Sequence, residues 1–200
     1  MNISVEMIKE LRALTGAGVL DAKRALEDAG GDFDQAASAL REKGLARAAK
    51  RSEREASEGL IEVYSHLGNR VGVMVELNCE TDFVAMNDQF QELAHDLALH
   101  VAAMAPRYLS REEVPQGDLD RQLEELRSQA LREGKPENIV EKIVQGRLSK
   151  FYAENVILEQ PFVKDDSVTV EDLIKNAISK LGENIILRRF VRYELGDSAE

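Results

Sequence analysis

The sequence predicts an α+β fold, in which an N-terminal bundle of three helices precedes a core with a small antiparallel sheet flanked by helices. Three observations support this prediction. Apolar residues recur at helical spacing between Val5 and Leu40. Two strand-like runs, 60–66 and 71–77, are separated by a Gly-Asn turn that is typical of a β-hairpin. A last strand-like run at 185–193 follows a series of longer helical patterns.

The three N-terminal helices are bounded by recognisable cap residues. The first is expected to begin after Ser4, a favourable N-cap, and to end at the glycines of "TGAG". The third is expected to begin at Asp32, which forms a capping-box pattern with Gln35, and to end at Gly44. A unit of this size buries little apolar surface, so we expect it to be a docking module.

A linker rich in Ala, Arg and Glu follows the third helix at 45–57 and has no strong apolar face. A solvated segment is favoured over a phosphate-binding one, because its basic side chains are interspersed with acidic ones. These basic residues are Arg47, Lys50, Arg51 and Arg54. We therefore divide the chain into 1–55, the bundle with its linker, and 56–200, the α+β core domain with a role in dimerisation.

Longer helices are predicted beyond the hairpin. Apolar periodicity favours helices at 90–104, 119–131, 139–151 and 169–181. Asn87 is the expected N-cap of the first of these, and Gly182 closes the last.

Composition limits the classes of function. The 200 residues include 26 basic and 37 acidic ones, which gives a net charge of −11. This acid excess argues against direct binding of nucleic acid or of an anionic membrane. The N-terminus lacks the apolar segment of a secretory signal, and no apolar run approaches the ~20 residues of a membrane span. We therefore expect a soluble intracellular protein.

Residues that could support catalysis are few and scattered. His95 and His100 are five residues apart on one helix, not the four of a helical zinc pair. Cys79 is the single cysteine and is expected to be a small buried residue. The Gly-x-Gly at Gly16 follows a helix rather than a strand, so it predicts a turn and not a dinucleotide site. We expect no cofactor and no metal, and favour an interaction protein over an enzyme.

The segment "NCETDFVA" leaves two interpretations open. In the first, Thr81 is an N-cap, Asp82 is a favourable first-turn acid and Phe83 is an ordinary core residue. In the second, Phe83 lies at an exposed corner and takes part in the function.

Five stretches, read in order, carry a resemblance to a known family. They are "KELRALTGAG", "DAKRALEDAGGDFDQAASALREKG", "ELNCETDFVA", "KIVQGRLSKFYAENVILEQPFVKDD" and "GENIILRRFVRYELG". Together they resemble bacterial translation elongation factor Ts over essentially the whole chain, to about Gly196.

The resemblance implies a guanine-nucleotide exchange factor for elongation factor Tu. In this family the N-terminal bundle is similar to ubiquitin-associated domains and docks on the partner's G domain. The resemblance also implies that the corner enters the G domain near its magnesium and phosphate site. Carried onto this sequence, Asp82 and Phe83 are the intruding pair, and Thr81 and Val84 shape and support the corner.

The resemblance further implies a set of docking residues on the first two helices. They are Lys9, Arg12, Val19, Leu20 and Lys23. The alternative is a solvated basic face with Val19 and Leu20 in the core. The chain departs from the family's common pattern at Ala22, where many members have Cys. It also resembles the short form with one core copy, which implies a homodimer.

Two alternatives of other classes remain at this point. The bundle could belong to a ubiquitin-associated-type adaptor at the ribosome without exchange activity. Cys79 could be the nucleophile of an uncharacterised enzyme, in which case Cys79→Ser would abolish the activity.

Overall fold

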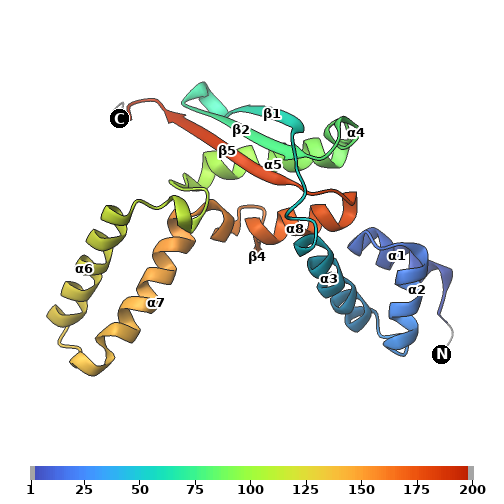
Figure 1. Cartoon of the computed structure of the whole chain (residues 1–200), viewed down its shortest axis with the longest axis horizontal. Coiled ribbons are helices and arrows are strands. Elements are labelled where there is room, and N and C mark those ends of the chain that lie inside the picture. The colour runs from blue at the N-terminus through green and yellow to red at the C-terminus, as the bar shows by residue number, and fades with distance from the viewer. Residues whose placement is uncertain (1–2, 198–200) are drawn as a thin grey trace. The chain divides into compact units, whose positions relative to one another are not determined.

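The computed structural model describes residues 3–197 and confirms the α+β class (Figure 1). Contacts between residues divide the chain into two compact units. The first comprises 1–64, 74–98 and 172–191, and the second comprises 65–73, 99–171 and 192–200. Each unit is therefore built from segments that are far apart in the sequence.

The first unit begins with a three-helix bundle, which runs from blue to teal in Figure 1. Its helices are α1 (Val5–Thr15), α2 (Val19–Asp28) and α3 (Phe33–Ala49). The expected caps form: Ser4 accepts a hydrogen bond from the Met7 N–H, and Asp32 accepts one from the Gln35 N–H. The buried core of the bundle consists of Leu11, Ala22, Leu26, Ala36, Ala37 and Leu40.

The prediction that Gly44 ends the third helix is wrong, because α3 continues to Ala49. Gly44 instead lies where α3 meets α8 (Val170–Leu181). A Cβ placed on Gly44 would lie 2.5 Å from the Ser179 hydroxyl oxygen and 3.2 Å from the Ser179 Cβ. This glycine therefore permits a close approach of two helices and does not terminate one.

A three-stranded sheet has the strand order β1-β2-β5 and contains the predicted hairpin. Its strands are β1 (Glu58–Ser65), β2 (Val71–Cys79) and β5 (Ile186–Glu194). The hairpin turn is the short helix η1 (Leu67–Asn69), in which Gly68 and Asn69 have positive φ. Helix α5 (Asp88–Met104) contacts β1 through His95, whose ring lies 2.9 Å from the Glu62 carboxylate.

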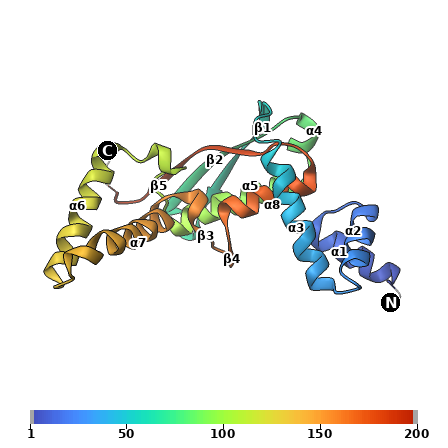
Figure 2. The same ribbon diagram turned by 60° about the horizontal axis from the view of Figure 1, so that its bottom comes forward.

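The alternating residues Val73, Val75, Leu77 and Cys79 of β2 are buried. Phe90, Ala94 and Leu97 of α5 are buried as well. Figure 2 shows α5 running alongside the sheet, so this helix covers one of its faces. The other face carries exposed apolar side chains, which are Ile61, Val63, Met74 and Val191.

The second unit contains a helical hairpin of α6 (Gln116–Arg132) and α7 (Glu137–Asn155). Pro136 immediately precedes α7 at its N-cap, as its fixed φ favours. The hairpin packs around Leu126, Ala130, Val140, Val144, Leu148 and Tyr152. Shorter elements were not predicted from the sequence: η2 (Arg111–Glu113), η3 (Ile157–Glu159), and the small antiparallel pair β3 (Pro161–Phe162) and β4 (Asp165–Thr169).

Between residues 3 and 197, no helix is both long enough and apolar enough to cross a membrane.

Candidate functional site

The corner after β2 is formed by the one-turn helix α4 (Asp82–Ala85). Thr81 is its N-cap, and the Thr81 hydroxyl oxygen accepts a hydrogen bond from the Val84 N–H at 3.5 Å. Asp82 lies in the first turn, where a negative charge stabilises a helix. The local roles expected for Thr81 and Asp82 are therefore confirmed.

Phe83 is exposed over 83% of its surface, so its interpretation as an ordinary core residue is wrong. Val84, the next residue on the same turn, is partly buried and packs α4 against the protein. Met86, just beyond α4, is exposed over 71% of its surface. An exposed large aromatic side chain on a short capped helix, with an exposed methionine three residues later, is typical of a protein-binding surface.

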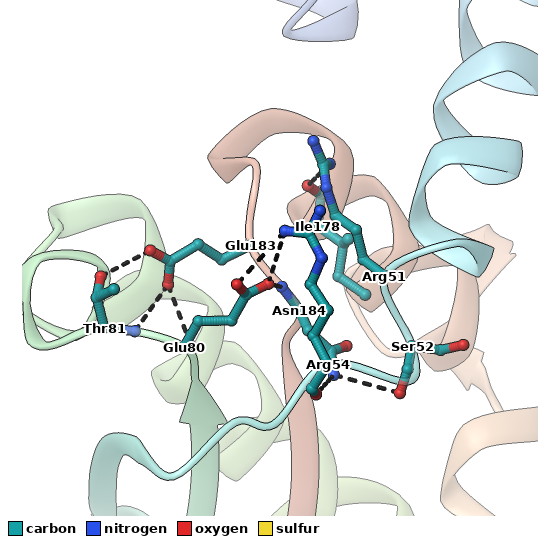
Figure 3. A network of polar contacts seen from close by, with 8 residues as sticks. All are labelled: Arg51, Ser52, Arg54, Glu80, Thr81, Ile178, Glu183 and Asn184. Atoms are coloured by element: carbon teal, nitrogen blue, oxygen red, sulfur yellow. Dashed lines mark hydrogen bonds and ion pairs between the residues drawn. The ribbon is translucent and has the colours of Figure 1, made fainter.

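The Glu183 carboxylate holds the start of this corner (Figure 3). Its Oε2 accepts hydrogen bonds from the backbone N–H groups of Glu80 and Thr81, at 3.1 and 3.0 Å. Its Oε1 accepts a hydrogen bond from the Thr81 hydroxyl at 2.6 Å. A carboxylate is an acceptor only, and here three donors are directed at it.

Cys79 lies beneath the corner at the end of β2 and is fully buried. Its thiol donates a hydrogen bond to the Thr81 carbonyl oxygen at 3.1 Å. Burial, reinforced by the nearby Glu183 carboxylate, raises the pKa of the Cys79 thiol to about 11. A buried thiol that stays protonated at neutral pH is a poor nucleophile, so the structure argues against a Cys79-dependent enzyme.

The five predicted docking residues of the bundle are all at the surface. Lys9 and Arg12 are exposed on α1, and Lys23 is exposed on α2. Val19 and Leu20 are exposed over 52% and 71% of their surfaces, so their alternative assignment to the core is wrong. They lie in the first turn of α2, directly after the break that separates α2 from α1.

Additional exposed apolar side chains occur near both groups, and sequence reasoning did not single them out. In the bundle they are Val5 and Leu14, and at the corner Met86. Val5 and Leu14 share the helical spacing that predicts α1, but the buried residue of this helix is Leu11. The exposure of any one of these residues cannot be recognised from the sequence, because each fits an ordinary amphipathic pattern. Only the three taken together suggest an apolar surface.

Three of the four basic side chains predicted in the linker make contacts within the chain, two of them as ion pairs at the surface. Arg47 pairs with Asp21 at 3.2 Å, and Arg54 lies 3.4 Å from the Glu80 carboxylate. Arg51 donates a hydrogen bond to the carbonyl oxygen of Ile178 at 3.3 Å. These contacts assign structural roles to three of the four side chains and support the interpretation that the cluster is not a phosphate site.

Within the described part of the chain, no three His, Cys, Asp or Glu side chains gather closely enough to hold a metal ion.

A family model described as elongation factor TS matches residues 6–197. The chain belongs to the elongation factor Ts family. A relative named elongation factor Ts from Herpetosiphon aurantiacus is 61% identical over 198 residues, which cover 99% of this chain and 100% of the relative. Elongation factor Ts of Carboxydothermus hydrogenoformans is 56% identical over 98% of this chain and 90% of its own length. Elongation factor Ts of Thermoanaerobacter sp. is 53% identical over 99% of this chain and 97% of its own. The match of the family model extends over the bundle, the corner and the C-terminal strand β5.

Proposed function

We propose that this chain is a guanine-nucleotide exchange factor. It binds elongation factor Tu in its GDP-bound and nucleotide-free states and promotes release of GDP during translation elongation. Membership in the elongation factor Ts family supports this function. The structural observation that carries it is the exposure of Phe83 on the capped helix α4. The function involves no covalent chemistry and belongs in the bacterial cytoplasm, where translation takes place.

In this mechanism the corner disturbs the partner's magnesium and phosphate site. Phe83 enters an apolar pocket of the G domain, and Asp82 makes polar contacts beside it. Thr81 and Val84 hold the turn that carries both residues. An exposed ring suits this role, because its burial on binding supplies free energy only in the complex.

A comparison of binding free energies shows that the corner cannot displace the nucleotide alone. A nucleotide held at nanomolar affinity is bound by about −12 kcal/mol. Burying one Phe supplies about 1.5–3 kcal/mol. The remaining binding energy has to come from other contacts, and the docking residues Lys9, Arg12, Val19, Leu20 and Lys23 are the proposed source. Coupling between two ligands is reciprocal, so incoming nucleotide weakens the factor's own binding and releases it.

We also propose that the protein is a homodimer through the outer face of its sheet. Ile61, Met74 and Val191 line one groove on this face, and Val63 of β1 is exposed over 68% of its surface. A contiguous apolar surface of this kind is more often covered by a partner than left in water. A second copy covers it with the same residues, as a two-fold interface requires.

The function is tested by stopped-flow release of fluorescent GDP from elongation factor Tu. We expect the unmodified protein to accelerate release by orders of magnitude, and Phe83→Ala and Asp82→Ala each to remove most of this effect. Leu131→Ala is the matched control, because it also truncates an exposed large apolar side chain but lies on α6. It should exchange like the unmodified protein.

Two results would overturn the proposal in different ways. If the unmodified protein binds elongation factor Tu without accelerating release, exchange activity is excluded and the adaptor function takes its place. If Phe83→Ala releases GDP as fast as the unmodified protein, the corner is not the working element and the docking helices have to carry the mechanism.

A further inference from the structure

The turn that follows α8 contacts two separate parts of the first unit. Gly182 adopts a positive φ of 83° and ends α8, and its N–H donates to the Ile178 carbonyl oxygen. The next two side chains then diverge, as Figure 3 shows: Glu183 reaches the corner, and Asn184 reaches the linker that follows the bundle. One short turn thereby joins two regions that the sequence places more than a hundred residues earlier.

On the corner side, Glu183 controls the cap of α4. The Thr81 hydroxyl donates its single proton to Glu183, which leaves its lone pairs free to accept from the Val84 N–H. Glu183 also binds the two backbone N–H groups at which the chain leaves β2. Both the rotamer of the cap and the direction in which the helix starts therefore depend on one carboxylate.

On the linker side, the buried Asn184 binds the backbone. Its Nδ2 donates to the Arg54 carbonyl oxygen at 2.7 Å and to the Ser52 carbonyl oxygen at 3.4 Å. Its backbone N–H donates to the Glu80 carboxylate at 2.6 Å, and Arg54 contacts the same carboxylate. Linker, turn and corner thus form one continuous polar network.

A helix of one turn does not hold its shape alone, because the hydrogen bonds it forms are too few to offset the cost of nucleation. Helix α4 comprises four residues, of which only Val84 and Ala85 are half-buried and none is fully buried, so packing alone does not fix its direction. The contacts that determine where Phe83 points are consequently those at the start of the helix, where Glu183 accepts two hydrogen bonds from Thr81 and one from the Glu80 N–H.

We propose that Glu183 is a positioning residue for nucleotide exchange: through Thr81 it orients α4 so that Phe83 projects toward the partner protein. Asn184 holds the same turn against the linker that follows the docking bundle, through its hydrogen bonds to the carbonyl oxygens of Ser52 and Arg54. This inference rests on the proposed exchange function for its consequence, but the positioning itself is a property of the free chain.

The first measurement is hydrogen–deuterium exchange of the free protein over residues 80–87. We expect Glu183→Ala to lose protection in this segment while the N-terminal bundle keeps its own. Glu183→Gln should retain much of the protection, because its amide oxygen still accepts from both backbone N–H groups and its NH₂ can donate to the Thr81 hydroxyl. Unchanged protection in Glu183→Ala would overturn the positioning role.

The second measurement separates binding of elongation factor Tu from acceleration of GDP release. We expect Glu183→Ala to lower the maximal release rate by roughly ten- to a hundredfold, since displacing a working group by about 1 Å has effects of this size. The concentration that gives half-maximal release should change much less, because the docking residues are untouched. An equal loss in a background that already carries Phe83→Ala would show that Glu183 does not act through Phe83.

Controls distinguish a specific effect of Glu183 on the corner from a general loss of structure. They also distinguish failure of this inference from failure of the proposed function. Glu159→Ala removes a surface carboxylate that pairs with Arg111 and should leave protection of the corner intact. If Glu183→Ala does not fold, Thr81→Val is used, because it keeps the branched shape and replaces the hydroxyl that links Glu183 to the Val84 N–H with a methyl group. If the unmodified protein does not accelerate GDP release, exchange function is excluded, and the hydrogen-exchange result alone decides whether Glu183 positions the corner.

Discussion

Phe83 and Cys79 are four residues apart and have opposite environments. Cys79 is completely buried under the corner, whereas Phe83 projects into solvent. The cause is the change from strand to helix at Thr81, which ends the alternation of β2 and starts a new pattern of side-chain directions. The small Cys79 is therefore buried and the large aromatic Phe83 is exposed. In an isolated domain the larger apolar side chain would be expected to be the buried one.

His100 is a second residue whose environment determines its behaviour. It is fully buried, and its Nδ1 accepts a hydrogen bond from the Val163 N–H at 3.2 Å. Its Nε2 therefore carries the proton and donates to the Gln160 side-chain oxygen at 2.9 Å. The Phe162 ring stacks at a centroid distance of 6.0 Å. Burial lowers the pKa of His100 from its ordinary value of 6.5, although the bond to Gln160 acts in the opposite direction.

The lowered pKa predicts a loss of stability in mild acid. Because the folded state disfavours charged His100, its contribution is complete above the unfolded pKa of about 6.5 and is lost as the pH falls below it. The free energy of unfolding should decline by up to about 1.4 kcal/mol per pH unit in this window. Urea unfolding between pH 7.5 and 5 measures the slope.

His100→Gln is the control for this slope, since glutamine does not titrate. We expect it to lower stability at every pH and to remove most of the decline between pH 6.5 and 5. The same decline in His100→Gln as in the unmodified protein would assign the effect to other groups.

At the scale of elements, helix α3 continues through a glycine because another helix lies against it. A Cβ at Gly44 would meet Ser179 of α8, so the residue that is weakest for helix formation is the one that packing requires. Gly146 of α7 is the opposite case, since a Cβ placed there would have no heavy atom within 4 Å.

Substitution by alanine should change the free energy of unfolding in opposite directions at these two glycines. Gly146→Ala should raise the free energy of unfolding by up to about 1 kcal/mol, because alanine is the better helix former. Gly44→Ala should lower it by about 1–3 kcal/mol, since overpacking outweighs that gain. Chemical denaturation measures both. Combining Gly44→Ala with Ser179→Ala should recover part of the loss, and no recovery would show that Ser179 is not the obstacle.

Elements with strong local signals could be predicted from the sequence. Ser4 and Asp32 marked helix starts by their capping chemistry, and the Gly-Asn turn marked the hairpin. The end of α3 could not be predicted, because it depends on Ser179, far along the chain. The pair β3–β4 is not predictable for a different reason: β3 has two residues and so no periodicity, and the five residues of β4, DDSVT, lack an alternating apolar pattern.

In the candidate site, too, features set by local sequence could be predicted, and those set by contacts between distant segments could not. Thr81 and Asp82 have local roles that their residue types indicate. The exposure of Phe83 was an open alternative until the resemblance to a family favoured it, because periodicity alone is compatible with a core residue. The three hydrogen bonds of Glu183 could not be inferred at all, since they join segments 102 or 103 residues apart.

For the whole molecule, the proposed homodimer gives a direct prediction. Val63→Lys places a charge on the outer face of the sheet, where burial in an interface would be costly. Analytical ultracentrifugation should show a dimer for the unmodified protein and a shift toward monomer for Val63→Lys. Leu131→Lys on α6 is the control and should remain dimeric, because Leu131 is also an exposed large apolar side chain, at 46% exposure against 68% for Val63. A monomer at all concentrations for the unmodified protein would contradict the prediction.

The distance in sequence between Thr81 and Glu183 has a consequence for synthesis. A growing chain produces the bundle, the hairpin and the corner long before it produces the carboxylate that holds the corner. At about 5–20 residues per second, the intervening hundred residues take several seconds to appear. During that interval the chain can present a folded docking bundle but not an oriented Phe83. In the proposed mechanism, an unfinished chain can therefore bind elongation factor Tu early, and it gains the capacity to release GDP only when synthesis is almost complete.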